Sequence, residues 1–136
     1  MPTFQKILTA NDVGATGSHQ AGMHIPKSKK AFLNFLPYLQ AEKRNPDNWF
    51  KCLDKEGNVW KFRFIYYNNK HHDQNGTRDE FRLTNMTRFF KHFNAMENDL
   101  FQITKEEKEE YYKIDILQED LTNIPTIHLT GWSEVD

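Results

Sequence analysis

Residues 59–67 read Val-Trp-Lys-Phe-Arg-Phe-Ile-Tyr-Tyr, and this stretch decides the fold. Aromatic residues stand at positions 60, 62, 64 and 66, and Lys61 and Arg63 alternate with them. Because successive side chains of a strand point to opposite faces, this spacing predicts a strand with one apolar face. Residues 48–54 form a second β-prone run, and Lys-Glu-Gly-Asn at 55–58 is typical of a turn. The sequence therefore predicts a hairpin whose apolar face covers a core, with Cys52 facing that core.

Shorter β-prone runs predict five more strands, at residues 3–8, 81–84, 100–104, 111–117 and 125–129. The two runs on either side of residues 105–110 form a second hairpin in this interpretation. An alternative is that Thr-Lys-Glu-Glu at 104–107 is a capping box that opens a short helix. The β-prone composition and short length of residues 111–117 favour the hairpin.

Two short helices are expected. Ser28 is a candidate cap for the first, and its apolar positions Ala31, Phe32, Phe35, Leu36 and Leu39 recur at helical spacing. Pro37 predicts a kink or an early end. Thr84 or Asn85 is a candidate cap for the second helix, whose apolar stripe is Met86, Phe89, Phe90 and Phe93. About seven short strands and two short helices predict a mainly β (α+β) fold, an antiparallel or open barrel with helices at its ends.

Composition limits the class of protein. The 136 residues predict a single domain over residues 1–136, and 14% aromatic residues favour a folded chain over disorder. The sequence contains no apolar run of membrane-spanning length and no apolar signal segment at its start, so we expect no membrane association. Cys52 is the single cysteine, which excludes an internal disulfide and a cysteine zinc site and makes a reducing cytoplasm the default location.

Charge is distributed unevenly along the chain, although the net charge is −1. Residues 1–94 hold 15 Lys and Arg against 8 Asp and Glu, whereas residues 95–136 hold 3 against 11. This asymmetry predicts one face that attracts a polyanion and another that does not. The alternative is that the two halves of the sequence do not form two halves of the surface.

Two segments are not explained by a core. Residues 11–24 carry three glycines and no strand or helix period, and residues 68–80 carry no large apolar side chain. Long ordered loops in small domains are usually functional. The alternative is surface disorder at the end of the hairpin.

These segments carry side chains that can recognise bases. Arg bridges O6 and N7 of guanine, carboxylates accept from N4 of cytosine, and Gln pairs with adenine. The candidate base-reading residues are His19, Gln20, His24, Arg78, Asp79, Glu80 and Arg82. The candidate phosphate-binding residues are Lys27, Lys29, Lys30, Asn69 and Lys70. Surface ion pairing among Arg78, Glu80 and Arg82 is an equally open interpretation.

Enzymatic signals are weak. Gly-Ala-Thr-Gly-Ser at 14–18 lacks the lysine that ends a phosphate loop, and the six His residues have no metal-ligand spacing. The strongest enzymatic alternative is a magnesium nuclease that uses Asp99 with Glu106, Glu107 and Lys108. A further alternative is a barrel that stacks single-stranded bases on its aromatic residues. We expect no catalytic residues and no bound metal.

Two motifs resemble a known family. ANDVGATGSHQAGMHIPK at residues 10–27 and GTRDEFRLT at residues 76–84 resemble the N-terminal effector domain of EcoRII-type restriction endonucleases. The family often carries Asn at the position of Asp79 and an aromatic residue at that of His24. The resemblance implies a B3-like DNA-binding pseudobarrel with two arms, an N-arm at about residues 11–27 and a C-arm at about residues 68–82.

The same resemblance implies the partners. The domain would read a short CCWGG-type site of double-stranded DNA through the major groove as a monomer in a bacterial cytoplasm. It would need no cofactor. A separate, covalently linked nuclease domain, absent from these residues, would use Mg²⁺ and make the full-length parent a type II restriction endonuclease.

Overall fold

The computed structural model describes residues 2–15, 21–118 and 131–135. Eight strands form one sheet in the order β2-β5-β4-β3-β7-β6-β1-β8. Neighbouring strands are antiparallel, except that β3 and β7 are parallel. The strands are β1 (Thr3–Ile7), β2 (Met23–Ile25), β3 (Asp47–Leu53), β4 (Val59–Tyr67), β5 (Glu80–Thr84), β6 (Leu100–Thr104), β7 (Tyr112–Leu117) and β8 (Ser133–Val135).

The β3–β4 hairpin confirms the main prediction. Phe62 and Phe64 are buried, as is Tyr66, whereas Lys61 is exposed. Cys52 also faces the core, and burial raises the pKa of its thiol far above the ordinary range. The β6–β7 hairpin around residues 105–110 is confirmed as well, so residues 104–107 do not open a helix.

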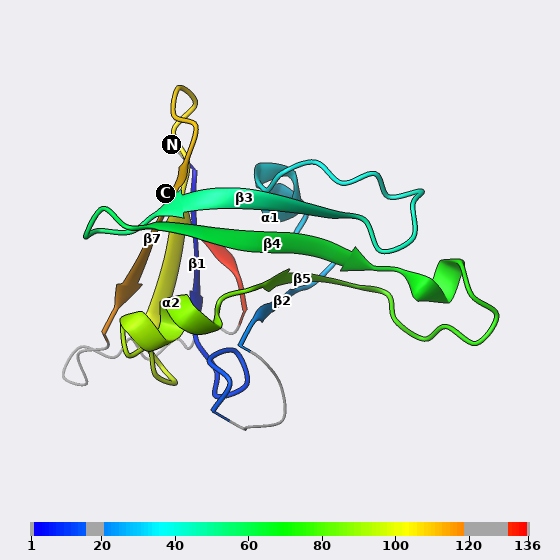
Figure 1. Cartoon of the computed structure of the whole chain (residues 1–136), viewed down its shortest axis with the longest axis horizontal. Coiled ribbons are helices and arrows are strands. Elements are labelled where there is room, and N and C mark those ends of the chain that lie inside the picture. Colours follow the sequence, from blue (N-terminus) through cyan, green and yellow to red (C-terminus); the bar gives the residue numbers. More distant parts are fainter. Residues whose placement is uncertain (1, 16–20, 119–130, 136) are drawn as a thin grey trace.

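The sheet curls into a half-barrel that is closed by side chains. Its two edge strands are joined by Trp132, just before β8, whose indole donates a hydrogen bond to the carbonyl of His24 on β2 (3.0 Å). Phe32 of α1 (Lys30–Phe35) packs on Trp132 at one end of the barrel (ring centroids 4.2 Å apart). Phe89 of α2 (Thr87–His92) packs on Phe62 at the other end (5.4 Å). Figure 1 shows the two helices apart from each other on the half-barrel. The expected barrel with helices at its ends is confirmed.

The starts of both helices were predicted wrongly. Lys29, not Ser28, occupies the cap position of α1, and the helix ends before Leu36, which is extended because Pro37 follows it. Met86 occupies the cap position of α2, because Asn85 adopts a positive φ of 62° and donates its side-chain amide to the carbonyl of Lys61 (2.7 Å).

Strand β2, within the segment expected to contain no strand, and strand β8 were missed. Each has three residues, too few to show a period, and each is held by pairing to a distant strand. The strand expected at residues 125–129 lies outside the described residues. None of the helices in the described ranges is long and apolar enough to cross a membrane.

Candidate nucleic-acid interface

Strand alternation sorts the residues of β2, β5, β4 and β3 onto two faces. In the register of the sheet His24 lies opposite Arg82, and Thr84 lies opposite Arg63, which in turn lies opposite Trp49. These side chains occupy one face. The residues between them, such as Leu83 and Phe62, point into the core. The polar face is therefore a consequence of the same two-residue period that builds the core.

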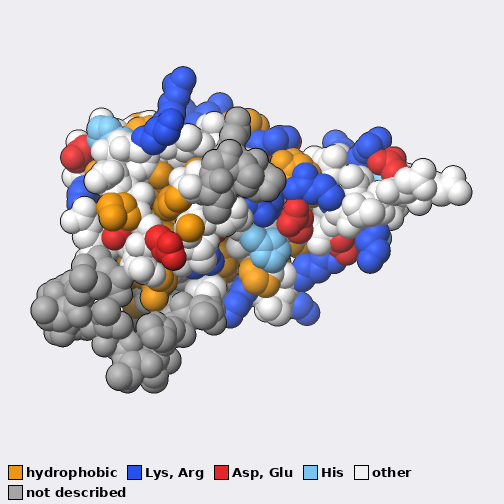
Figure 2. All heavy atoms as spheres, turned by 90° about the horizontal axis from the view of Figure 1, so that it is seen from below, with side chains coloured by type: hydrophobic (Ala, Val, Ile, Leu, Met, Phe, Trp, Pro, Cys, Tyr) orange, Lys and Arg blue, Asp and Glu red, His pale blue; other side chains and the backbone are white. Residues whose placement is uncertain are grey.

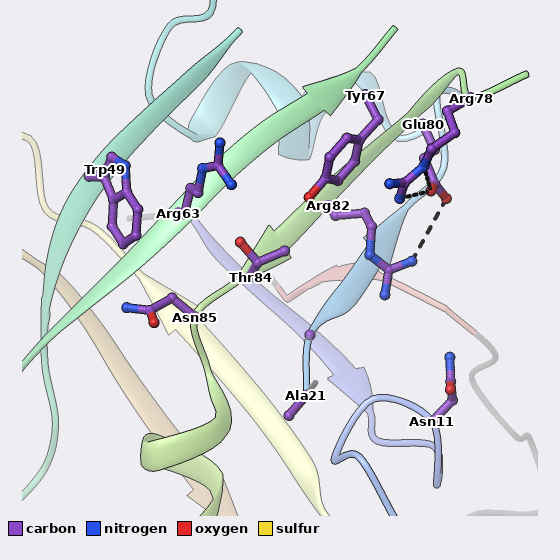
Figure 3. A pocket seen from close by; sticks show the side chains of 11 residues that line it. Asn11, Ala21, Trp49, Arg63, Tyr67, Arg78, Glu80, Arg82, Thr84 and Asn85 are labelled. Carbon is purple, nitrogen blue, oxygen red and sulfur yellow. Dashed lines mark hydrogen bonds and ion pairs between the residues drawn. The ribbon is translucent and has the colours of Figure 1, made fainter. Parts of the chain in front are cut away.

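A hollow of about 460 Å³ lies over this polar face (Figure 3). Arg78, Glu80 and Arg82 lie together on one side of it, and Trp49 and Arg63 lie on another. Its lining residues come from three strands and from both predicted arms: Asn11, Ala21, Gly22, Trp49, Arg63, Tyr67, Arg78, Glu80, Arg82, Thr84 and Asn85. The two segments that the core left unexplained thus meet at one site.

An ion-pair ladder forms one side of the hollow. Nη2 of Arg78 lies 2.6 Å from Oε1 of Glu80, and Nη1 of Arg82 lies 3.7 Å from Oε2. The guanidinium of Arg78 also lies over the ring of Tyr67, 3.6 Å from its centroid. Burial opposes ionisation of Glu80, but the hydrogen bond and charge of Arg78, with the charge of Arg82, lower the pKa of the carboxyl. The ladder therefore presents two cations around one ionised acceptor.

Asp79 is directed to the opposite face. Its Oδ1 accepts a hydrogen bond from the hydroxyl of Tyr66 (2.5 Å), and its Oδ2 pairs with Lys27 and lies 3.3 Å from Nε2 of His71. The hydrogen bonds from Lys27 and Tyr66 hold the pKa of Asp79 far below its usual range. Asp79 is thus adjacent to Arg78 and Glu80 in sequence but not in the hollow.

The second arm, which is the C-arm expected at about residues 68–82, has a defined path that projects from the barrel beyond the end of β4 (Figure 1), and its last residues belong to β5. Asn68 is buried and binds three backbone groups of residues 41–45: it accepts from Asn45 and donates to the carbonyls of Ala41 and Lys43. A 3-10 turn, η1 (Asn69–His71), follows it. The alternative of a disordered hairpin end is therefore wrong.

The base of the second arm is closed by Asn69. Its Oδ1 accepts from the backbone of Arg78 (2.8 Å), and the carbonyl of Arg78 accepts from Lys70 (3.0 Å). Gly76 packs so tightly here that a Cβ would lie 2.1 Å from the carbonyl oxygen of Asn69. The predicted phosphate residue Asn69 thus supports the arm, while Lys70 remains exposed on it.

The described part of the first arm is tied to the barrel by Asp12. Its carboxylate pairs with Lys6 and accepts from the backbone of Thr9, and its carbonyl accepts from Gly22. Gly22 itself lies so close to β5 that a Cβ would be 2.8 Å from the carbonyl oxygen of Leu83. His19 and Gln20 lie outside the described residues. Of this arm's predicted base-reading residues, the structure places His24 on the polar face.

Positive side chains gather around the arms. In Figure 2 the Lys and Arg side chains concentrate on and beside the projecting part of the molecule. The strands of the acidic segment, β6, β7 and β8, lie in the other half of the sheet from β2, β5, β4 and β3. Strand β1 is the exception, because it belongs to the basic part of the sequence but lies between β6 and β8. None of the four predicted phosphate lysines lines the hollow itself, and Lys30 borders a different depression beside Phe64 and Phe81.

The proposed magnesium cluster does not assemble. Asp99 precedes β6 and Glu106 follows it, and a five-residue strand spans about 17 Å. Asp99 instead accepts a hydrogen bond from the backbone of Met96 (2.9 Å). The single-strand stacking platform is also wrong, since Phe62, Phe64 and Tyr66 are buried in the core.

One carboxylate–histidine group does come together, at Asp54, Glu56 and His92. Nε2 of His92 lies 2.8 Å from Oε1 of Glu56. Both oxygens of Asp54 already accept hydrogen bonds within the β3–β4 turn. The group lies at the end of the hairpin away from the second arm, so it has no part in the hollow.

Comparison with known proteins identifies the family. The family described as "Restriction endonuclease EcoRII, N-terminal" matches residues 1–110 of the chain. The chain belongs to the EcoRII N-terminal domain family. The type II restriction enzyme EcoRII of Escherichia coli is 39% identical over an alignment of 91 residues, and the match covers 60% of this chain and 20% of that protein. This EcoRII-N chain thus spans about a fifth of the length of the curated relative.

The fold of this EcoRII-N chain is the expected B3-like pseudobarrel. The solved structure of the Arabidopsis FUS3–DNA complex matches it with a TM-score of 0.63 and 23% identity, over 85% of this chain and 96% of that one. The expected and observed architectures therefore agree, with eight strands described where about seven were expected.

Four residues of the hollow in this EcoRII-N chain lie outside both predicted arms and both motifs, and sequence reasoning missed them: Trp49, Arg63, Tyr67 and Asn85. Trp49 is 45% exposed, and the cations of Lys61 and Arg63 lie 5.7 and 5.9 Å from its ring. The alternation of aromatic and polar residues in β4 could have indicated these positions. Positions 61, 63 and 67 must face away from the core, and Trp49 pairs with Arg63 across the hairpin.

Proposed function

We propose that the domain binds double-stranded DNA sequence-specifically, with its two arms in the major groove and the polar face between them over a short CCWGG-type site. The observation that carries the proposal is the ladder of Arg78, Glu80 and Arg82 on a hollow bordered by both arms. Family membership supports it, because the matched relative is a restriction enzyme.

The ladder suits the G·C pairs of such a site. Each guanidinium offers two N–H donors for O6 and N7 of guanine, and Glu80 offers an acceptor for N4 of cytosine. Partly exposed ion pairs are worth about 0–1 kcal/mol, so DNA can replace them at little cost. A bidentate base contact discriminates by about 1–3 kcal/mol, so a few such contacts suffice for a short site. His24 lies opposite Arg82 in the sheet and, in this proposal, reads bases beside it. Base reading by His19 and Gln20 stays a prediction, whereas Asp79, whose carboxylate is directed away from the hollow, is left out of the base-reading set.

Phosphate contacts form the rim in this proposal. Lys27, Lys29, Lys30, Asn69 and Lys70 stay predicted phosphate residues. Trp49, with Lys61 and Arg63, adds a rim on β3 and β4, where an indole can pack against the sugar and the cations against phosphates. Phosphate contacts bind every sequence alike and weaken as salt rises.

The domain needs no metal or cofactor for binding in this proposal and has no catalytic residues of its own. Cleavage belongs to a linked, Mg²⁺-dependent nuclease domain of a full-length bacterial type II restriction endonuclease, which acts in the cytoplasm. The isolated domain binds as a monomer. Whether the site is a cleavage target or an effector site is decided by that partner domain.

A gel-shift titration tests the proposal. A duplex with one CCWGG site is compared with a scrambled duplex at two salt concentrations, in EDTA and in Mg²⁺. We expect an affinity gap on the order of 10³ or more, no dependence on Mg²⁺ and no cleavage. Equal binding of both duplexes with a steep loss at high salt would reduce the function to phosphate contact. Better competition by single strands would contradict the duplex as ligand.

A further inference from the structure

Resting on the proposed two-arm binding of DNA, we infer that Asp79 is a positioning residue that joins the two arms and holds their separation. Its carboxylate contacts Lys27 of the first arm, His71 of the second arm and Tyr66 of β4. We call these four residues the arm clamp. Asp79 was expected to read a base, and the clamp assigns it a different role.

Strand alternation explains why Asp79 is turned away from the hollow. Arg78, Glu80 and Arg82 line the hollow, whereas Phe81 and Leu83 pack on the core side of β5. Asp79 stands two residues before Phe81 and therefore continues the core-side row past the end of the strand. Its side chain is 18% exposed, and its carboxylate already has partners from three segments.

Register places Lys27 beside Asp79. In the β2–β5 pair Ile25 lies opposite Phe81, and two further residues along each chain bring Lys27 opposite Asp79. The β2–β5 pairing itself covers only three residues on each strand. The ion pair of Lys27 with Asp79 therefore extends the connection between the arms beyond the point where backbone pairing stops.

Tyr66 anchors the clamp to the core. Its ring stacks on Phe81, with centroids 4.2 Å apart and planes 12° apart, and the ammonium of Lys27 lies 5.9 Å from its centroid on β4. Burial and the neighbouring carboxylate raise the pKa of Tyr66 to about 12, so its hydroxyl remains a donor at neutral pH. A rigid donor on β4 thus fixes the position of a carboxylate that both arms share.

The clamp predicts how Asp79→Ala will act. Without the carboxylate the arms sample other separations, and the affinity for DNA falls by the fraction of molecules in the competent arrangement. If that fraction drops to about one tenth, the Kd rises about tenfold. The rise is the same for the CCWGG duplex and for its single-base-pair variants, because no base contact is removed. Loss of a base-reading residue instead erases the preference at one base pair.

The first measurement is the separation of the arms in the absence of DNA. Spin labels on Ser28→Cys and Thr77→Cys report it, since both positions are exposed and Cys52 is fully buried. We expect a narrow distance distribution in the parent protein and a broad one after Asp79→Ala. Tyr66→Phe removes one hydroxyl and should broaden it less. Asp79→Asn keeps an acceptor for Tyr66 but loses the ion pair with Lys27, so its distribution should lie between those of the parent and of Asp79→Ala. An unchanged distribution in Asp79→Ala and Tyr66→Phe overturns the clamp.

The second measurement is the Kd of each variant for the CCWGG duplex and for every single-base-pair variant of it. A common factor across the panel supports positioning, and loss of preference at one base pair overturns it. Failure of the proposed function is seen separately, as a parent protein that does not distinguish CCWGG from scrambled DNA. The distance measurement still tests the clamp in that case, because it uses no DNA. If Asp79→Ala lowers the Tm sharply, the distance distribution and the Kd panel are measured on Tyr66→Phe instead.

Discussion

The two ends of the β3–β4 hairpin are both organised by a buried polar side chain, but the bonds differ in reach. At the turn, Asp54 accepts four hydrogen bonds, all from residues 56, 58 and 60. At the arm, Asn68 binds backbone groups of residues 41–45, more than twenty positions away. The hydrogen bonds of Asp54 therefore stay within the turn and the first residues of β4. The arm is supported by the bonds of Asn68 to residues 41–45, which leaves Arg78 and Glu80 facing the hollow.

This difference in the reach of the hydrogen bonds indicates which end of the hairpin can carry a binding function. The local hydrogen-bond network of Asp54 stabilises the turn and displays no side chain toward the hollow. A long-range network supports a projecting segment without using the side chains that it displays. Changes at the turn should therefore affect folding alone, and changes at the arm should affect folding and DNA binding together.

Replacing Asn68 with Ala should have the largest effect. The change leaves the backbone N–H of Asn45 and the carbonyls of Ala41 and Lys43 without this partner, and we expect a loss of about 3 kcal/mol in unfolding free energy. Urea denaturation measures it, and the gel shift should show weaker specific binding. Asn75→Ala, at an exposed position of the same arm, is the control. Unchanged DNA binding after Asn68→Ala would break the comparison.

Replacing Asp54 with Ala should cost about 2 kcal/mol of unfolding free energy, because the indole of Trp60 and the turn amides lose their buried acceptor. The Kd for the CCWGG duplex should not change, since the turn is remote from the hollow. Lys55→Ala in the same turn should alter neither quantity. A specific loss of DNA affinity in Asp54→Ala would show that the two ends are coupled.

Replacing Arg78 with Ala should have the opposite effect to Asp54→Ala: DNA recognition should weaken while stability stays nearly unchanged. The exposed pair with Glu80 contributes little to folding, so unfolding free energy should change by no more than about 0.5 kcal/mol. Discrimination at one base pair should fall by about 1.5 kcal/mol, measured as the ratio of Kd values on matched and substituted duplexes. Arg88→Ala on α2, outside the hollow, serves as the control. A uniform loss across all sequences would make Arg78 a phosphate contact.

The smallest expected effect is a change in how the unfolding free energy depends on pH when Asp79 is replaced with Asn. The folded-state pKa of Asp79 lies far below the unfolded value of about 3.9, so its stabilising contribution is complete above that value and is lost as the pH falls toward the folded pKa. Asp79→Asn removes this titration. The unfolding free energy of the variant should therefore fall less steeply between about pH 5 and pH 2. Parallel pH profiles for the two proteins would show that Asp79 does not hold its partners in solution.

Much of the fold was readable from the sequence because its signals are local. The alternation at residues 59–67, the turn at 55–58 and the β6–β7 hairpin follow from side-chain period and turn composition, and the structure confirms them. The starts of both helices were predicted wrongly because long-range contacts compete with local capping, as when Asn85 bonds to Lys61.

The candidate site divides in the same way. Sequence alone selected the two arms and the residues Arg78, Glu80 and Arg82, because Gly-rich and polar segments without a core period stand out, and the two motifs resembled a family. Only tertiary structure turned Asp79 toward Lys27 and brought Trp49 and Arg63 to the hollow. Which face a side chain occupies depends on strand register, and register is set by pairing between segments far apart in the chain.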